Sequence, residues 1–144
     1  MKILVINGPN LNMLGRRDTS LYGTDTLDDI ERRIGDRAEA LGIDVEFFQS
    51  NHEGELVDAI HAARGRCAGI VVNPGAFTHY AWAIHDALAA FEGPVVELHL
   101  SNPAAREPWR HTSVVAPVAS GTIAGFGGAG YRMAVEAVAD LLDG

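Results

Sequence analysis

The run Ala68-Gly69-Ile70-Val71-Val72 decides the fold, because it is short and carries no polar side chain. A strand with one face in water alternates polar and apolar residues, so this run predicts a strand covered on both faces, as in a parallel sheet. Three similar runs lie at Ile3-Leu4-Val5-Ile6, Val45-Glu46-Phe47-Phe48 and residues 94–100, and a weaker fifth lies in residues 113–116 or 122–126.

Helical patterns separate these runs. The first helix is expected to begin after Thr26, which pairs with Asp29 in the pattern of a capping box, and to end before Gly42. Three more are expected over residues 56–65, 78–91 and 134–141. Strands that alternate with helices predict an α/β fold, a flavodoxin-like three-layer sandwich around a five-stranded parallel sheet.

Length and composition limit the class of protein. The 144 residues, 47% of them hydrophobic, suit a single catalytic domain over residues 1–144. The lone Cys67 indicates a reducing compartment, and no apolar run is long enough for a signal peptide or for the ~20 residues of a membrane span. We therefore expect a cytoplasmic protein. The net charge of −8 disfavours nucleic acid as a partner, so an anionic substrate would need a local cluster of cations.

The loop after the first strand is the first candidate for the site, because ligands of such folds bind beyond the carboxyl ends of the strands. Residues 8–24 exceed the ~2–6 residues that are usual for such a connection. The loop carries Arg16, Arg17 and Tyr22. It is expected to be an active-site lid, and the alternative is a solvated loop whose tyrosine only packs.

The segment Asn73-Pro74-Gly75-Ala76-Phe77-Thr78-His79 follows the third strand. Thr78 is expected to cap the next helix, whose N-terminus offers free N–H groups to a carboxylate. His79 would then lie in the first turn of that helix. The alternative for His79 is an ordinary exposed residue at a helix start.

The fourth strand carries polar residues where a central parallel strand should be apolar. Glu97, His99 and Ser101 alternate along residues 94–101 and so share one face. An edge strand with one wet face is one interpretation. The other is a carboxylate that orients an imidazole for acid–base chemistry, with Arg110 in the following loop.

Two further patterns are given less weight. Residues 125–130 match the dinucleotide fingerprint G-x-G-x-x-G, but no strand follows their helix, so tight backbone packing is the preferred interpretation. The six histidines lack zinc-type spacing, and His61 and His85 are expected at the surface. We therefore expect neither a metal site nor a bound cofactor.

Five motifs in order resemble the type II dehydroquinases of the shikimate and quinate pathways, over nearly the whole chain. The resemblance implies a flavodoxin-like hydro-lyase that dehydrates 3-dehydroquinate to 3-dehydroshikimate through an enolate, without an imine or a metal. The motifs are Gly8-Pro9-Asn10-Leu11-Asn12 with Leu14-Gly15 and Tyr22-Gly23, Gln49-Ser50-Asn51-His52-Glu53-Gly54, Asn73 to His79, Glu97-Leu98-His99-Leu100-Ser101-Asn102, and Gly125-Phe126-Gly127 to Gly130-Tyr131.

The family pattern also implies roles for single residues. Tyr22 resembles the base, and because a phenol is a poor base at neutral pH, Arg17 matches the cation that favours its charged form. Asn10 resembles the residue that helps to stabilise the enolate. His99 resembles the general acid, with Glu97 as its orienter. Residues expected to hold the substrate are Asn73, His79, Arg110, the backbone N–H groups of Leu100 and Ser101, and Asp86 across a subunit contact.

The usual assembly of the family is a dodecamer of four trimers, so we expect a homo-oligomer. The chain departs from the family pattern at Asp18-Thr19, where Glu-Pro is usual, and at His111-Thr112, which leaves His111 outside the predicted site. Two other functions use the same fold, a receiver-like signalling module and a flavin or nucleotide carrier. A receiver would need acids at the ends of the first and third strands, where this chain has Asn7 and Asn73.

Overall fold

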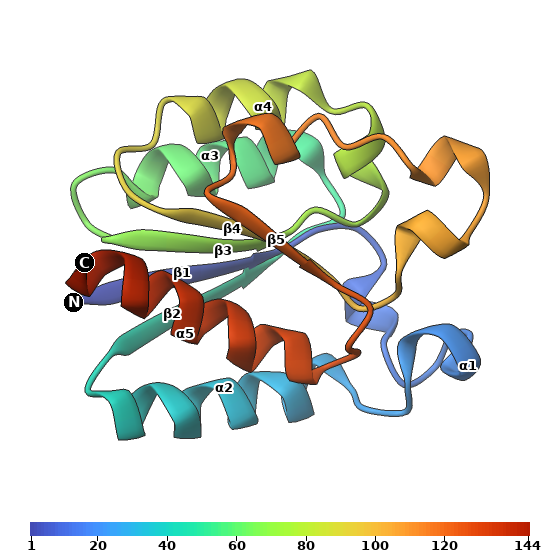
Figure 1. The fold of residues 1–144 in the computed structure, drawn as a ribbon, viewed down its shortest axis with the longest axis horizontal. Helices are drawn as coiled ribbons and strands as arrows, with labels where there is room; N and C mark the ends of the chain where they lie inside the picture. Colours follow the sequence, from blue (N-terminus) through green and yellow to red (C-terminus); the bar gives the residue numbers. More distant parts are fainter.

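A computed structural model describes residues 1–144 and contains one five-stranded parallel sheet, in the order β2-β1-β3-β4-β5 (Figure 1). This order confirms the predicted flavodoxin-like fold. The fifth strand lies at the second of its two expected positions, and residues 113–116 form no strand. The strands are β1 (Lys2–Asn7), β2 (Asp44–Gln49), β3 (Gly69–Asn73), β4 (Val95–His99) and β5 (Gly121–Ala124).

Helices cover both faces of the sheet. In Figure 1, α2 (Leu27–Leu41) and α5 (Ala129–Asp143) lie on one face, and α3 (Glu53–Ala63) and α4 (Trp82–Ala89) lie on the other. The short α1 (Thr19–Tyr22) lies beyond the carboxyl ends of the strands, within the expected lid. None of the helices combines the length and the apolar composition that a membrane crossing requires.

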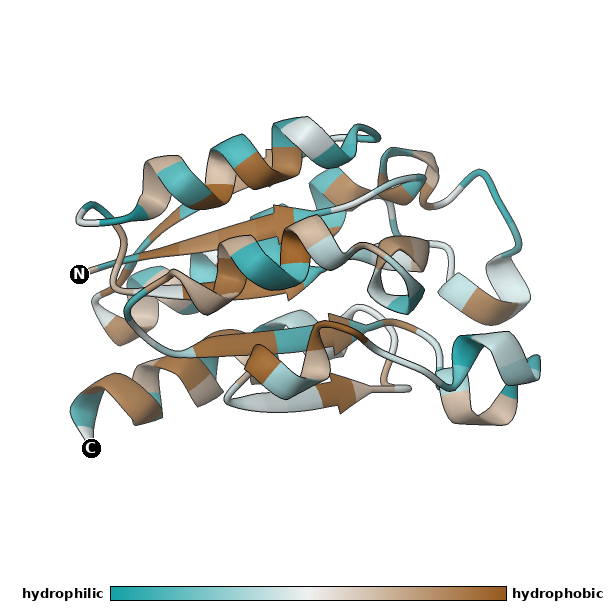
Figure 2. Ribbon diagram, turned by 90° about the horizontal axis from the view of Figure 1, so that it is seen from above, coloured by the Kyte–Doolittle hydropathy of each residue, from teal (hydrophilic) through white to brown (hydrophobic).

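Two apolar cores follow from the alternation of side chains along the strands. Ile3 and Val5 pack toward α2 and α5, while Leu4 and Ile6 pack toward α3 and α4. Figure 2 shows the strands as largely hydrophobic and the helices as hydrophobic on one side only. Each large aliphatic side chain buried in this way contributes about 1.5–3 kcal/mol.

The start and end of α2 agree with the sequence pattern. Thr26 Oγ1 accepts a hydrogen bond from Asp29 N, and Asp29 Oδ2 accepts one from Thr26 N, which completes the capping box. Gly42 follows the helix in the left-handed conformation, with φ of 72°, where a side chain would be strained.

The expectations for Thr78 and His85 are wrong. Residues 75–79 form a 3-10 turn, and α4 begins only at Trp82, with Ala81 at the N-cap position. Thr78 does not cap this helix, because its hydroxyl donates to the Glu97 carboxylate instead. His85 is half-buried rather than at the surface, because its Nδ1 hydrogen-bonds the carbonyl of Val114 at 2.6 Å.

Close packing explains Gly130, the last glycine of residues 125–130 and the second residue of α5. A Cβ atom there would lie 2.7 Å from Leu98 Cδ1, so the buried Leu98 side chain of β4 would have to move. β4 itself lies between β3 and β5. The interpretation of Glu97 and His99 as residues of an edge strand is therefore wrong, and their burial in an interior strand needs another explanation.

Candidate active site

A cavity of about 180 Å³ lies at the carboxyl edge of the sheet, between the lid, the 3-10 turn after β3 and the loop after β4. Glu97 and Asp86 are the two predicted site residues that do not line it. A wider hollow of about 560 Å³ lies at the opposite edge near Lys2, but it contains none of the predicted site residues. The predicted residues that line the smaller cavity are Asn10, Arg17, Tyr22, Asn73, His79, His99, Leu100, Ser101 and Arg110.

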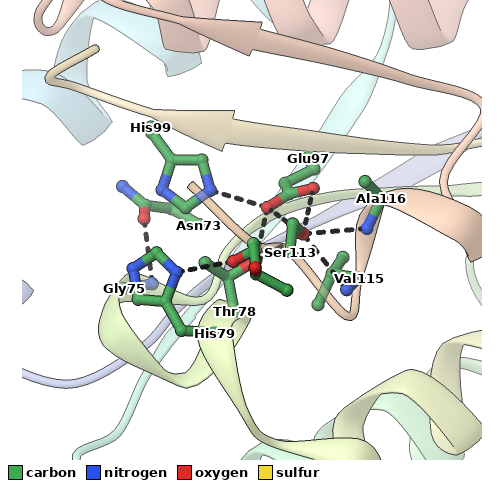
Figure 3. A network of polar contacts seen from close by, with 10 residues as sticks. Asn73, Gly75, Thr78, His79, Glu97, His99, Ser113, Val115 and Ala116 are labelled. Carbon is green, nitrogen blue, oxygen red and sulfur yellow. Dashed lines mark hydrogen bonds and ion pairs between the residues drawn. The ribbon is translucent and has the colours of Figure 1, made fainter. Parts of the chain in front are cut away.

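Glu97 and His99 form a polar pair at the end of β4. The Glu97 carboxylate is fully buried and lies 2.6 Å from Nε2 of His99 (Figure 3). Two hydroxyls also reach this carboxylate, Thr78 Oγ1 at 2.5 Å and Ser113 Oγ at 2.9 Å. With Nε2 directed at Glu97, Nδ1 is the nitrogen of His99 that remains for a ligand in the cavity.

The charge of Glu97 depends on these contacts. Burial raises the pKa of the carboxyl, but hydrogen bonds from His99, Thr78 and Ser113 outweigh burial and hold the pKa below its ordinary value of 4.5. The carboxylate is therefore ionised at neutral pH. An anion at this point accepts a hydrogen bond, so Nε2 of His99 carries the hydrogen that lies between it and Glu97.

Two cations lie against the ring of Tyr22 in the lid. The guanidinium carbon of Arg17 is 4.3 Å from the ring centroid, and that of Arg106 is 5.4 Å away. Both guanidinium groups would attract negative charge on the phenol oxygen of Tyr22. The arrangement can thus supply a base on one side of the cavity and an acid, His99, on another.

Sequence reasoning missed Arg106. It follows the turn at Asn102-Pro103, and nothing in its immediate sequence marks it as different from other loop arginines. In the structure its Nη1 donates to Ser101 Oγ at 3.0 Å, which directs the guanidinium toward the cavity. The arginine was detectable only through the fold, which brings this loop against the lid.

Asn10 adopts a conformation that is rare for residues other than glycine. Its φ is 69°, in the left-handed region. Asn51 holds it there, because Asn51 Oδ1 accepts a hydrogen bond from Asn10 N at 3.0 Å. Gln49 Nε2 donates to the same Oδ1 and to the carbonyl of Gly8. The Gln49–Asn51 segment therefore fixes the start of the lid, and local strain of this kind gathers at functional sites.

Asn73 is oriented by a buried tyrosine that sequence reasoning did not assign to the site. Asn73 Nδ2 donates to the hydroxyl of Tyr131 at 3.0 Å, and Tyr131 in turn donates to Asn7 Oδ1 at 2.5 Å. Asn73 Oδ1 accepts from the backbone N–H of Gly75. With the amide held at both ends, its second N–H and its second lone pair are available at the cavity.

His79 and Arg110 lie on the outer side of the cavity. His79 Nδ1 hydrogen-bonds the carbonyl of Thr112 at 2.7 Å, and because a carbonyl only accepts, Nδ1 carries the proton. Arg110 stacks on Trp109, 4.0 Å from the ring centroid, and donates to Glu107 at 3.0 Å. Asp86 is exposed on α4, away from the cavity of its own chain.

The charge around the cavity is opposite in sign to that of the whole chain. Three arginines and two histidines line it, and no acidic residue does. The chain as a whole carries a net charge of −8. The fold thus gathers the local cluster of cations that the sequence analysis required for an anionic substrate.

Comparison with known proteins gives a consistent result. The model of the family described as Dehydroquinase class II matches residues 1–139. The chain is 60% identical to 3-dehydroquinate dehydratase 2 of Pseudomonas putida, over 97% of this chain and 94% of the relative. It is 58% identical to catabolic 3-dehydroquinase 1 of Aspergillus terreus, over 95% and 90%. The type II dehydroquinase of Butyrivibrio crossotus has a similar structure, with a TM-score of 0.95, 47% identity and coverage of 96% and 97%.

Proposed function

We propose that this chain, which belongs to the type II dehydroquinase family, dehydrates 3-dehydroquinate to 3-dehydroshikimate in the cavity at the carboxyl edge of its sheet. The observation that carries this proposal is that Tyr22 and His99 line the same cavity. Two guanidinium groups lie against the ring of Tyr22, and His99 contacts the buried carboxylate of Glu97. A base and an acid on one cationic cavity suit the loss of a proton and a hydroxyl from an anionic substrate.

The residues divide the reaction into two proton transfers. Tyr22, as the phenolate, takes a proton from the carbon beside the ketone, and the electron pair of that C–H bond forms an enolate. Asn10 helps to stabilise the enolate oxygen. The enolate then expels the hydroxyl from the next carbon, while the imidazolium of His99 gives that hydroxyl a proton from Nδ1. Water leaves, and the product is a conjugated enone.

The remaining residues of the cavity hold the substrate. Arg110 and the backbone N–H groups of Leu100 and Ser101 would meet the carboxylate and the nearby oxygens. Asn73 offers one N–H and one lone pair to a ring hydroxyl. His79, with its proton on Nδ1, offers Nε2 as an acceptor, so it suits a hydroxyl that donates.

We also propose that no imine forms. The only lysine, Lys2, begins β1 at the edge opposite the cavity and lies 3.9 Å from Glu46. Borohydride with substrate should therefore leave the enzyme active. A substrate adduct on Lys2, detected by mass spectrometry, would contradict the enolate route.

The assembly is proposed to be a homo-oligomer of trimers, and a dodecamer by analogy with the family. Tyr80, just before α4, and Trp82, its first residue, are about 60% exposed, and the same helix carries Asp86. A neighbouring subunit would cover them and could receive Asp86 at its own cavity. An active, stable monomer in light scattering would contradict this.

We further propose a cytoplasmic location, where Cys67 stays reduced.

The direct test is the ultraviolet absorbance of the enone that forms when purified protein meets 3-dehydroquinate. A metal chelator should leave the rate unchanged. The protein should also be colourless and free of nucleotide, which distinguishes the enzyme from a flavin or nucleotide carrier of the same fold. Absence of enone formation by a folded protein would overturn the proposed activity.

A further inference from the structure

We propose that Thr78 and Ser113 are positioning residues, whose hydroxyl hydrogens keep Glu97 anionic and thereby fix His99 with Nε2–H toward Glu97 and Nδ1 toward the cavity. This positioning role rests on the proposed function, because His99 is the general acid of the proposed reaction. The four side chains come from three separate parts of the chain and meet within one network (Figure 3).

A count of donors and acceptors at Ser113 determines where its proton points. Ser113 Oγ accepts from the backbone N–H groups of Val115, at 3.2 Å, and Ala116, at 2.9 Å. A hydroxyl has two lone pairs, so both are occupied. The hydroxyl hydrogen must then be donated, and the Glu97 oxygens lie at 2.9 Å.

The same count constrains Thr78. Its hydroxyl lies 2.8 Å from Ser113 Oγ and 2.5 Å from Glu97 Oε2. Because the lone pairs of Ser113 are occupied, the hydrogen of Thr78 can only be donated to Glu97. Thr78 lies at this point because Val114 N donates to its backbone carbonyl at 2.7 Å, which joins the 3-10 turn to the Ser113 segment.

Both hydroxyls beside the carboxyl group are therefore donors to it. Two donated hydrogens favour the ionised carboxylate, and Nε2 of His99 is the one remaining neighbour with which a proton could be shared. An ionised Glu97 requires Nε2 of His99 to carry a hydrogen, so the nitrogen that faces the cavity is Nδ1. The hydroxyl pair thus sets which atom of His99 can protonate a leaving group.

One titratable group near this network lies outside the cavity, namely His85 of α4, whose Nδ1 hydrogen-bonds the carbonyl of Val114. The others lie on the cavity side. They are Arg17 and Tyr22 of the lid, Arg106 and Arg110 of the loop after β4, and His79 of the 3-10 turn. None of them hydrogen-bonds Glu97, whose side-chain partners are Thr78, Ser113 and His99 alone. Removing one hydroxyl should consequently act on Glu97 and leave the groups that hold substrate in place.

The test measures the titration of the Glu97 carboxyl carbon by NMR, without substrate, in wild type, Thr78→Val and Thr78→Ser. Thr78→Val keeps the side-chain shape and the backbone contact but removes the donor. Its midpoint should rise by about one pH unit or more, because a hydrogen bond to a charged group is lost. Thr78→Ser restores the hydroxyl and should titrate like wild type. An unchanged midpoint in Thr78→Val would overturn the proposal.

Kinetics then tests the positioning role. At neutral pH, Thr78→Val should lower kcat about tenfold with KM nearly unchanged, and should add little in a Glu97→Gln background. Ser120→Ala is the matched control, because that hydroxyl only accepts from Val95 N at the other end of β4. A shifted midpoint with wild-type kcat would refute the positioning role. If Thr78→Val does not fold, Ser113→Ala compared with Ser113→Thr takes its place.

The two measurements separate this inference from the proposed activity. The NMR titration needs no substrate, so it gives its result even if the protein does not dehydrate 3-dehydroquinate. A raised midpoint in an enzyme without that activity would refute the proposed function while leaving the Thr78 and Ser113 contacts with Glu97 established.

Discussion

The guanidinium group of Arg17 lies against the ring of Tyr22, with its carbon 4.3 Å from the ring centroid. Both residues belong to the lid, which places the tyrosine on the cavity that His99 also lines. A cation so close to the ring attracts negative charge on the phenol oxygen, and exclusion of water would strengthen this attraction. The two residues should therefore act as one unit.

Tyr22→Phe should abolish turnover, with a loss of about a hundredfold or more, because the proton acceptor is gone. Substrate binding and thermal stability should change little, since the substitution keeps the aromatic ring that packs against the core. Arg17→Ala should approach the same loss, and Arg17→Lys should recover part of it. The measurements are kcat for each variant and the dissociation constant of the complex between substrate and an inactive variant. Equal rates for Tyr22→Phe and wild type would remove Tyr22 from the mechanism.

His99→Ala should separate the two proton transfers. Loss of the leaving-group acid should stop formation of the enone, but Tyr22 and Arg17 would still remove the proton beside the ketone. Deuterium from solvent should then appear at that carbon, as NMR can record. Tyr22→Phe is the matched control and should exchange no deuterium. If His99→Ala fails to exchange while it still binds substrate, the acid and the base cannot be assigned to separate residues.

The fold was predictable because its signals are local. Apolar runs such as residues 68–72 and the capping box at Thr26 depend on a few neighbouring residues, and both are confirmed. The start of α4 was not predictable. Thr78 resembles a cap in sequence, yet its hydroxyl is used by Glu97, nineteen positions away. A tertiary hydrogen bond of this kind has no local sequence pattern.

In the candidate site, too, only residues with a local sequence signal could be predicted. Glu97 and His99 could be found because two polar residues interrupt an apolar strand. Arg106 and Tyr131 could not, because a loop arginine and a tyrosine on a helix are ordinary in sequence. Their positions become informative only when the sheet brings Asn73 to Tyr131 and the loop after β4 brings Arg106 to the lid.

Tyr131→Phe should weaken substrate binding through Asn73. The change removes the group that accepts from Asn73 Nδ2 and donates to Asn7 Oδ1, so two buried amides lose a partner. The free energy of unfolding should fall by about 1–3 kcal/mol, and KM should rise more than kcat falls. In an Asn73→Ala background, Tyr131→Phe should leave KM unchanged, because the orienting contact no longer exists.

Val138→Ala supplies the control for Tyr131. It truncates another buried residue of α5, one that packs against Gly69 away from the cavity, and it should lower stability without changing KM. Thermal unfolding and steady-state kinetics on the same samples compare the two variants. An equal rise of KM in both would mean that Tyr131 acts only through general stability.

The free energy of unfolding should depend on the ionisation of Glu97 at acidic pH. Burial alone would raise the pKa of this carboxyl, but its hydrogen bonds hold the folded-state pKa below the ordinary value of 4.5. A group whose pKa is lowered on folding stabilises the native state above its unfolded pKa, and that contribution is lost as the pH falls through the folded value. Glu97→Gln should therefore be less stable than wild type at pH 7, by about 1–3 kcal/mol. The difference should shrink as the pH falls below 4.5.

Urea unfolding of wild type and Glu97→Gln between neutral and acidic pH measures this difference directly. Glu39→Gln is the control, because it removes an exposed carboxylate near the end of α2 and should give a curve parallel to that of wild type. The folded state of Glu97→Gln is checked by circular dichroism at each pH. A constant difference between wild type and Glu97→Gln across the whole range would show that Glu97 has the same proton affinity in both states, contrary to the donor network around it.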